Sequence, residues 1–484
     1  MNRAYEMVIG LETHVELRTK SKVFCACKNA FGAEPNTHVC PVCMGLPGAL
    51  PVFNAQVLRY AAMAGMALGC HVHHRSRFDR KNYFYPDLPK AYQISQFYRP
   101  LCEGGALTIQ TGAGEKRVGI TRIHIEEDAG KLLHDEKSGT ALDMNRCGVP
   151  LIEIVSEPDI RSAEEAVAYL RKLRAILTYT GVSDCRMNEG SMRCDVNLSV
   201  HRPGEPFGVR TEMKNLNSFQ SVERAIEAEY RRQVEALEAG EAVVQETRRY
   251  DQKTGKTSSM RRKENSADYR YFPDPDLPEI YLGDAEMAEI RSSIPALPDE
   301  RRMRYMQRYG LTAYAVEQLT AERWLAEYFE RAAEVAQNPV ALCNLILGEV
   351  FAQITLRDTA HTGERGPEAL PVSPEHLAAL SDMIGAGKVN SSTGKKILSA
   401  LFDQDQDPAA YAQDHDLFTL TDPAALEAAA REALENNPDM VKTYRSGKTS
   451  VEKALMGKAM ALTRGKADPE ALRQKLLELL GEQG

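Results

Sequence analysis

The sequence has no long apolar run and no segment typical of an export signal. The longest uncharged stretch, residues 38–58, contains Pro41, Pro47 and Pro51, so it cannot form one apolar helix. The N-terminal residues carry an early acid, Glu6, and contain no apolar signal core. We therefore expect no transmembrane helix and a cytoplasmic location.

Cysteine is also scarce, because ten cysteines in 484 residues are too few for a disulfide scaffold. Hydrophobic residues make up 43% of the chain and charged residues 26%, values that disfavour extended disorder, collagen and coiled-coil rods. The net charge of −8 argues against non-specific coating of nucleic acid. The length favours a globular protein of about three domains.

The common phosphate-binding loops and hydrolase motifs are missing. Gly255–Thr257 and Gly447–Thr449 resemble the end of a Walker loop, but the required earlier glycine is replaced by Tyr250 and Lys442. Gly112–Gly114 lacks the third glycine of a dinucleotide fingerprint and is more typical of a hairpin loop. There is no His-Glu-x-x-His and no Gly-x-Ser-x-Gly motif, so no hydrolase nucleophile is visible.

Short alternating runs in residues 1–290 predict strands, and they lie at Tyr5–Leu17, Ala106–Gln110, Val118–Ile125, Leu151–Val155 and Asp195–Val200. Two helices are expected among them. The first begins with a capping box of Ser162 and Glu165 and ends before Gly181. The second spans about residues 218–238. This pattern indicates an α+β fold with a mixed sheet.

The rest of the chain is predicted to be helical. The stiff segment Pro273–Pro278 favours a boundary after the first domain, and a polar stretch at Asp358–Pro374 interrupts the helices that follow. We predict an α+β domain at residues 1–292, an all-α helical domain at 293–408 and an all-α tail domain at 409–484.

Four cysteines form two close pairs. Cys25 and Cys27 are followed after twelve residues by Cys40 and Cys43. Two such pairs can complete a tetrahedral zinc site with no position open to substrate. The sequence therefore predicts a structural zinc knuckle, the alternative being four reduced thiols.

Acidic residues recur on the predicted strands. Glu12, His14 and Glu16 alternate with apolar residues, so they share one strand face. Further acids occur in or directly after other predicted strands: Glu126, Glu127, Asp128, Asp195 and Glu212. Acids delivered to one face of a sheet could hold Mg²⁺, which binds carboxylate oxygens and bridges to phosphates. The alternative is a solvated polar face.

Two loops and one basic segment complete the candidates. Phe78–Gln96 and Asp268–Pro273 mix aromatic rings with cations, a composition typical of ligand pockets as well as of packed surface loops. Residues 442–466 hold seven Lys or Arg against one acid. A local basic patch in an acidic chain favours a nucleic acid, and RNA in particular, over a merely solvated helix face.

These blocks together resemble the B subunit family of glutamyl/aspartyl-tRNA amidotransferases. The resemblance extends over essentially the whole length, and its most specific blocks are Ile9–Leu17, Phe78–Phe97, Ile120–Gly130, Val149–Pro158 and Tyr269–Pro273. It implies that the first domain is a catalytic cradle similar to glutamine synthetase and that the tail binds tRNA. It also implies a heterotrimer with a glutaminase A subunit and a small C subunit.

The implied reaction uses ATP and Mg²⁺ to phosphorylate the side-chain carboxylate of Glu or Asp misloaded on tRNA(Gln) or tRNA(Asn). Ammonia from the glutaminase then displaces phosphate.

Carried over by position, the resemblance implies catalytic roles for Glu12, His14, Glu126 and Glu127. It implies magnesium ligands at Glu12, His14, Glu127, Glu212 and Asp195. The implied substrate or nucleotide contacts are Lys81, Tyr83, Lys90 and Gln93. The basic segment supplies tRNA-binding candidates: Lys442, Arg445, Lys448, Lys453 and Lys458.

Two other functions stay open at this point. A stand-alone carboxylate–amine ligase that uses free ammonia would need the acids but not the basic tail. A non-catalytic zinc and RNA-binding scaffold would need the cysteines and the tail, but it would leave the clustered carboxylates unexplained.

Overall fold

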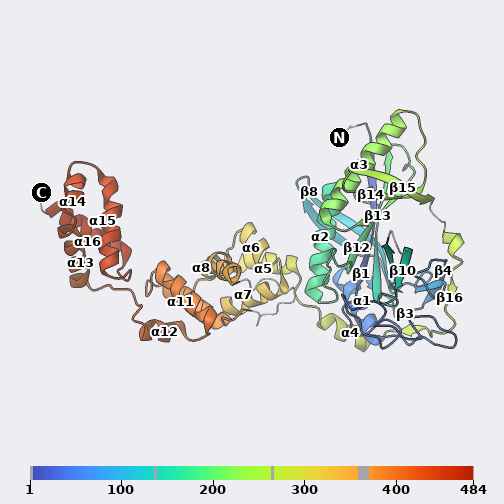
Figure 1. Cartoon of the computed structure of the whole chain (residues 1–484), viewed down its shortest axis with the longest axis horizontal. Coiled ribbons are helices and arrows are strands. Elements are labelled where there is room, and N and C mark those ends of the chain that lie inside the picture. Colours follow the sequence, from blue (N-terminus) through green and yellow to red (C-terminus); the bar gives the residue numbers. More distant parts are fainter. Residues whose placement is uncertain (1–3, 136–138, 263–265, 358–369, 483–484) are drawn as a thin grey trace. The chain divides into compact units, whose positions relative to one another are not determined.

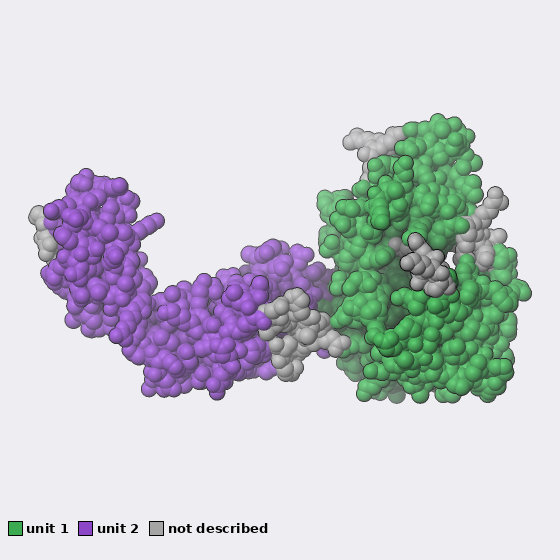
Figure 2. All heavy atoms as spheres, in the orientation of Figure 1, with its two compact units in different colours: residues 1–297 green, residues 298–484 purple. Residues whose placement is uncertain are grey.

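The computed structural model describes residues 4–135, 139–262, 266–357 and 370–482. The chain divides into two compact units, residues 1–297 and 298–484, which are shown in different colours in Figure 2. The first unit contains the large sheet and the second is helical (Figure 1). The expected α+β region followed by helices is confirmed.

Over the described residues, the first unit is built on a ten-stranded mixed sheet in the order β15-β14-β13-β12-β1-β11-β8-β6-β2, with β7 paired to β8. Its strand pairs are antiparallel except for β13 and β14, which run parallel. The strands are β1 Glu6–Glu16, β2 His71–Val72, β6 Cys102–Glu103, β7 Ala106–Thr111, β8 Gly114–Glu127, β11 Pro150–Ser156, β12 Met192–His201, β13 Thr211–Leu216, β14 Glu246–Asp251 and β15 Lys256–Arg262.

Helices cover one face of this sheet. The helices α1 (Ala55–Ala67), α2 (Ala163–Thr180) and α3 (Phe219–Glu238) contact the sheet through β8, β7 and β12 respectively (Figure 1). Since side chains alternate along a strand, Leu11 and Val15 of β1 are buried in the hydrophobic core while Glu12 and His14 point to the other face. The sheet therefore has one apolar face under helices and one polar face.

The sequence signals at the helix ends are confirmed. The Ser162 hydroxyl accepts a hydrogen bond from the Glu165 backbone N–H at the start of α2, and Gly181 ends that helix at a φ of 73°. Ser218 caps α3 in the same way. Helix α1 was missed, because its run of small and apolar residues follows a proline-rich loop; Asn54 caps it.

The two aromatic loops are brought together. A three-stranded sheet joins β16 (Phe272–Pro273), β4 (Asp79–Asn82) and β5 (Tyr92–Ser95), so both loop motifs form one structure. The rings of Phe97 and Tyr271 stack with centroids 4.1 Å apart. The remaining elements of the first unit are β3 Arg75–Ser76, β9 Lys131–Asp135, β10 Gly139–Asp143, β17 Ile280–Tyr281, the 3₁₀ turn Ser266–Tyr269 and α4 Asp284–Ser292.

The described part of the second unit contains two separate hydrophobic cores. One is formed by residues between Tyr305 and Ala412, and the other by residues between Leu426 and Leu480. The helices are α5 Pro298–Tyr309, α6 Ala313–Leu319, α7 Arg323–Val335, α8 Pro339–Leu345, α9 Phe351–Leu356, α10 Pro374–Gly385, α11 Ser391–Asp403, α12 Pro408–Asp414, α13 Pro423–Glu435, α14 Pro438–Arg445, α15 Glu452–Leu462 and α16 Pro469–Glu482, with a π-helical turn at Ile346–Val350 and a 3₁₀ turn at Thr449–Val451.

One continuous helical stretch, Pro339–Leu356, is long and apolar enough by composition to cross a membrane. No such segment was expected from the sequence, because Glu349 interrupts this apolar run. One side of the stretch, including Leu342, Ile346 and Val350, is buried in the first helical core. This packing is that of a core helix.

Candidate active site

The polar face of the sheet gathers a histidine and two glutamates from three adjacent strands. His14 on β1 lies opposite Glu153 on β11, and Glu126 comes from β8, the next strand. The Nε2 atom of His14 is 3.4 Å from Glu126 Oε1 and 3.6 Å from Glu153 Oε2. Each of the three can place a ligand atom within 4.8 Å of the others. This first acidic group could hold a metal ion.

A second histidine, His124, contacts both glutamates of the first acidic group. His124 Nε2 lies 3.2 Å from Glu153 Oε2 and 3.8 Å from Glu126 Oε2, and its side chain is buried. Burial raises the pKa of Glu153, but the imidazoles of His124 and His14 outweigh burial and hold it well below the ordinary value. The carboxylate of Glu153 is therefore ionised at neutral pH.

A second acidic group lies beside the first on the same face. Glu12 of β1, Asp195 of β12 and Glu212 of β13 also bring carboxylate oxygens within 4.8 Å of one another. Neighbouring side chains hold them in place: Asn197 Nδ2 donates to Glu12 Oε1 over 2.9 Å, and the Lys214 ammonium pairs with Asp195. Such bonds fix carboxylate orientation before any ligand arrives.

Glu126 and Glu127 point to opposite sides of β8, as alternation requires. Glu126 joins His14, whereas Glu127 Oε1 accepts a hydrogen bond of 2.8 Å from the Ile94 backbone N–H and pairs with the Lys90 ammonium. The structure thus does not bring Glu127 together with the other expected magnesium ligands. Instead, Glu127 links β8 to β5 through Ile94 and to the loop that precedes β5 through Lys90.

Charged residues border the first acidic group at the end of β8. Asp128 pairs with Arg193 over 2.5 Å and with Arg146 over 3.6 Å. Burial raises the pKa of Asp128, but the two guanidinium groups outweigh burial and lower it below its usual value. On β1, burial and the Asp128 charge raise the pKa of Glu16 to about 8. Glu16 therefore loses its proton less readily than an exposed glutamate.

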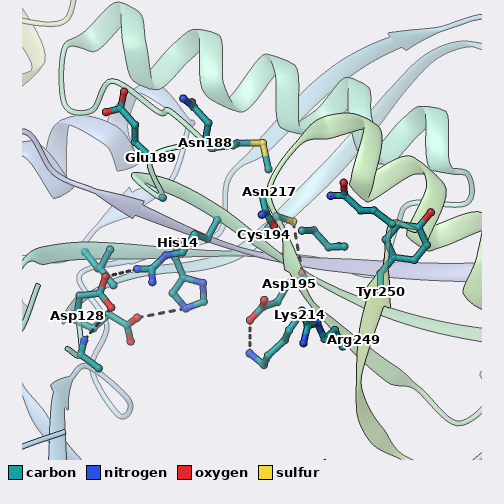
Figure 3. Close-up of a pocket in the computed structure, with 18 of the residues that line it drawn as sticks. His14, Asp128, Asn188, Glu189, Cys194, Asp195, Lys214, Asn217, Arg249 and Tyr250 are labelled. Atoms are coloured by element: carbon teal, nitrogen blue, oxygen red, sulfur yellow. Dashed lines mark hydrogen bonds and ion pairs between the residues drawn. The ribbon is translucent and has the colours of Figure 1, made fainter. Parts of the chain in front are cut away.

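A cavity of about 930 Å³ opens over this polar face. Figure 3 shows His14 and Asp128 in one part of it and Asp195, Lys214 and Arg249 in another. Lys81, Tyr83 and Gln93 line the cavity as well, whereas Lys90 is not among the residues that line it. The Lys81 ammonium lies 4.9 Å from the centre of the Tyr269 ring. Burial lowers the pKa of Lys81, but Tyr271, Glu126 and Tyr83 outweigh burial and raise it, so Lys81 is a cation beside the first acidic group.

The four predicted cysteines meet in space. Sulfur atoms from Cys25, Cys27, Cys40 and Cys43 all lie within 4.8 Å of one another, and the last two sulfurs are 3.9 Å apart. Tetrahedral zinc, with bonds of about 2.3 Å, separates its sulfur ligands by about 3.8 Å. The donor set and spacing therefore fit zinc.

A buried cation supports the same interpretation. Lys22 is fully buried, and its ammonium lies 2.7 Å from the His38 carbonyl oxygen and 3.6 Å from Cys43 Sγ. The hydrogen bond from Cys25, aided by Lys22, lowers the pKa of Cys43 to about 4, so this sulfur is a thiolate. A buried ammonium requires an anion nearby, and a zinc tetrathiolate carries two negative charges.

The five predicted tRNA-binding cations are all exposed on the second helical core. Lys442 and Arg445 lie on α14, Lys453 and Lys458 on α15, and Lys448 between them. Within the described ranges none of the five forms an ion pair. The single acid of the segment is engaged by Arg473 of α16. The positive charge of these five side chains therefore faces solvent.

Comparison with known proteins decides the family. Residues 7–288 match the GatB/GatE catalytic domain and residues 327–480 match the GatB domain. The chain belongs to the family of aspartyl/glutamyl-tRNA(Asn/Gln) amidotransferase B subunits. It is 50% identical to the B subunit of Caldicellulosiruptor saccharolyticus over 98% of this chain and 99% of the relative. It is 50% identical to that of Oleidesulfovibrio alaskensis, over 99% of each chain, and 46% identical to that of Lachnoclostridium phytofermentans, over 99% of this chain and all of the relative.

Several residues of the cavity were not predicted from the sequence. Glu153 alternates with apolar residues in Leu151–Val155 as Glu12 does on β1, so the same signal could have identified it. Arg193, Lys214 and Arg249 carried no such signal, because a cation on a strand is most often solvated. Only the strand order brings them to the acids.

Proposed function

We propose that this protein activates and amidates the amino acid carried by misacylated tRNA, using Glu-tRNA(Gln), Asp-tRNA(Asn) or both as substrate. One observation carries the proposal: two acidic groups lie side by side on the open polar face of a cradle in a chain of this family. The relatives are named for these tRNA substrates, and the site supplies groups suited to phosphoryl transfer.

The proposed chemistry has two steps. An oxygen of the substrate's side-chain carboxylate attacks the γ-phosphorus of ATP, and ADP leaves. Ammonia then attacks the carbonyl carbon of this acyl phosphate; the C–O bond to phosphate breaks, and loss of a proton leaves the amide. A carboxylate alone is a poor electrophile, so phosphorylation supplies the leaving group. Mg²⁺, when bound, offsets charge on the phosphoryl oxygens.

We assign the magnesium-holding role to the two acidic groups. The first comprises His14, Glu126 and Glu153, and the second Glu12, Asp195 and Glu212. The buried or half-buried carboxylates suit a hard cation, because ionised acids so close together need positive charge between them. Glu126 takes the ligand role that the family resemblance gave to Glu127, since Glu126 is the glutamate that lies beside His14.

The residues around the loops of β4 and β5 are proposed to hold the reacting groups. Lys81, Tyr83 and Gln93 line the cavity and could contact nucleotide or the aminoacyl end of tRNA. Lys90 acts indirectly in this proposal, because its ammonium is engaged by Glu127. The cradle is proposed to share its fold with glutamine synthetase.

The other parts follow from the same proposal. Zinc held by Cys25, Cys27, Cys40 and Cys43 would stabilise the knuckle without taking part in the reaction. The two separate helical cores support a division of the helical region into two parts, of which the last is proposed to bind tRNA; the first core extends to Ala412, past the predicted bound at 408. The relatives are B subunits of a larger enzyme, which supports a complex with a glutaminase A subunit and a small C subunit. Reduced thiols suit the cytoplasm.

The test uses the chain assembled with candidate A and C subunits, Glu-tRNA or Asp-tRNA, glutamine and γ-labelled ATP with Mg²⁺. We expect phosphate release coupled to formation of Gln-tRNA or Asn-tRNA. Glu126→Gln should lower the rate of phosphorylation by about 100-fold or more, because it removes a carboxylate from the first acidic group. Affinity for tRNA should not change, since the basic segment is untouched.

Glu127→Gln is the matched control, because it alters the adjacent residue on the opposite strand face. It keeps a hydrogen-bond acceptor for the Ile94 N–H, so we expect less than about a tenfold loss. An equal or larger loss in Glu127→Gln would return the ligand role to Glu127. Phosphate release with free glutamate and ammonia, without tRNA, would instead support a stand-alone ligase.

A further inference from the structure

Beyond the acids, the cavity has a cationic side that no predicted role uses. Strands β13 and β14 run parallel, and Lys214 pairs in register with Arg249. Both side chains line the cavity, and Lys253 joins them from the turn between β14 and β15 (Figure 3 labels Lys214 and Arg249). The polar face therefore changes from acidic on β8, β11 and β1 to basic on β14.

The cations differ in what already holds them. Lys214 pairs with Asp195 and lies 3.5 Å from Glu212, so the second acidic group already neutralises its positive charge. Arg249 and Lys253 are exposed to the cavity, and neither side chain forms an ion pair within the described part of the chain. Their charge is available to an anion.

The preceding residue, Arg248, has a structural role that differs from that of Arg249. Arg248 points to the opposite face, where it is buried and pairs with Glu229 and Glu246. Arg249 has no such partner among the described residues and faces the cavity instead. Since successive side chains on a strand point to opposite faces, the two arginines have separate roles.

We propose that Arg249, with Lys253 beside it, binds the phosphate chain of the nucleoside triphosphate. This inference rests on the proposed function, because it assumes that ATP reacts at the acidic groups. Arg249 lies directly opposite Lys214 on the adjacent strand, where strands are about 4.8 Å apart, and Lys214 pairs with Asp195 of the second acidic group. A phosphate chain whose end lies at the second acidic group therefore comes within reach of the guanidinium, which matches phosphate oxygens with two parallel N–H donors.

Phosphate could also come from the tRNA backbone, but the geometry favours ATP. The reacting carboxylate of the tRNA substrate must lie at the acidic groups. Its nearest phosphodiester is separated from that carboxylate by the aminoacyl group and the terminal ribose, whereas the phosphates of ATP are contiguous with the transferred one. The cation one strand from the acids therefore serves the nucleotide.

The first experiment measures the kinetics of the assembled complex. Arg249→Ala should raise the KM for ATP by about tenfold or more, as loss of a charge-assisted hydrogen bond to phosphate predicts, and change the KM for Glu-tRNA less than about twofold. Arg249→Lys should restore part of the loss. Arg224→Ala, an exposed arginine on α3, is the matched control and should match the wild type.

The second experiment measures binding to the full chain with ATP, ADP and adenosine as competitors of labelled ATP. Arg249→Ala should weaken ATP and ADP but leave adenosine unchanged, because only the phosphates contact the arginine. A raised KM for Glu-tRNA with an unchanged KM for ATP would assign the site to tRNA phosphate and overturn the proposal, as would no change in either.

The two proposals can fail separately. If the wild-type complex does not couple phosphate release to amidation of the aminoacyl-tRNA, the proposed function fails. Equal binding of ATP by the wild type and Arg249→Ala, with both chains showing the same thermal unfolding, refutes the phosphate site alone.

Discussion

At the residue scale, a strand's two-residue period determines which side chains can act together. Glu12 and His14 were placed on one face from the sequence alone, and the structure puts both on the polar face. The same period separates Glu126 from Glu127, yet the sequence could not tell which of them faces the cavity. That choice depends on the pairing of Leu151 with Glu126 across β8 and β11, which is a tertiary fact.

Lys22 leads to a prediction about the cysteine cluster. Lys22→Met keeps the apolar stem but removes the ammonium that lies 3.6 Å from Cys43 Sγ. We expect zinc to bind the variant about 10- to 100-fold more weakly, as measured by competition with a chromogenic chelator, because an orienting group that stabilises a thiolate ligand is lost. The Cys43 thiol should also become less reactive in the metal-free protein, since its pKa of about 4 is lowered in part by Lys22.

Lys20→Met provides the control for this effect. Lys20 precedes the cluster by a few residues but is exposed. Its variant should bind zinc as the wild type does. Unchanged zinc affinity in Lys22→Met would mean that the buried ammonium serves only packing.

At the scale of elements, local signals were enough for much of the fold. Ser162 and Gly181 mark the two ends of α2, which could be predicted because capping chemistry is local. The predicted hairpin loop at Gly112–Gly114 joins β7 to β8. The parallel pairing of β13 and β14 was not predictable, because nothing in either strand encodes its direction relative to a distant partner. The cationic side of the cavity depends on that pairing, which explains why sequence reasoning missed it.

Glu229 ties α3 to the edge of the sheet and gives a pH-dependent prediction. It is fully buried and accepts hydrogen bonds from Thr211, Arg232 and Thr257. Burial raises its pKa, but the bonds from Arg232, Thr257 and Gln233 outweigh burial and lower it below 4.5. Its ionised form therefore stabilises the fold above the pKa of the unfolded chain, and that contribution is lost as pH falls through the folded value.

We expect Glu229→Gln to reduce the free energy of unfolding by about 3 kcal/mol at pH 7, because it removes one member of a buried ion-pair network. The difference from the wild type should hold down to about pH 5 and shrink below the ordinary glutamate pKa. Urea unfolding at several pH values measures this difference in the free energy of unfolding. Glu227→Gln, an exposed glutamate two residues away, should stay within about 0.5 kcal/mol of the wild type. A difference that is independent of pH would contradict the assignment.

At the scale of the whole molecule, charges of opposite sign are concentrated in different parts of the chain. The acids that face the cavity lie in the first unit, while the exposed cations of residues 442–466 lie on the last helical core of a chain with a net charge of −8. This division was visible from composition because it needs no tertiary detail. The boundary between the units falls after Leu297 rather than at the predicted 292, and Leu297 packs against the hydrophobic core of the first unit.

The charge division predicts how tRNA affinity should respond to salt. Lys448→Glu with Lys453→Glu places acids where two exposed cations stand, so tRNA should bind more weakly. A plot of log affinity against log salt should become shallower by about 0.7 to 0.9 for each phosphate that the variant no longer neutralises, because fewer counterions are released on binding. Fluorescence anisotropy with labelled tRNA between low and moderate salt gives both quantities.

Lys396→Glu, at an exposed lysine of α11, changes the net charge in the same direction and should leave the slope intact. Lys396→Glu changes the net charge by half as much as the double variant. If it lowers the logarithm of tRNA affinity by half as much, the effect comes from net charge and the basic segment does not bind tRNA. If only the double variant flattens the slope while ATP turnover with saturating tRNA persists, binding and chemistry reside in different units of the chain.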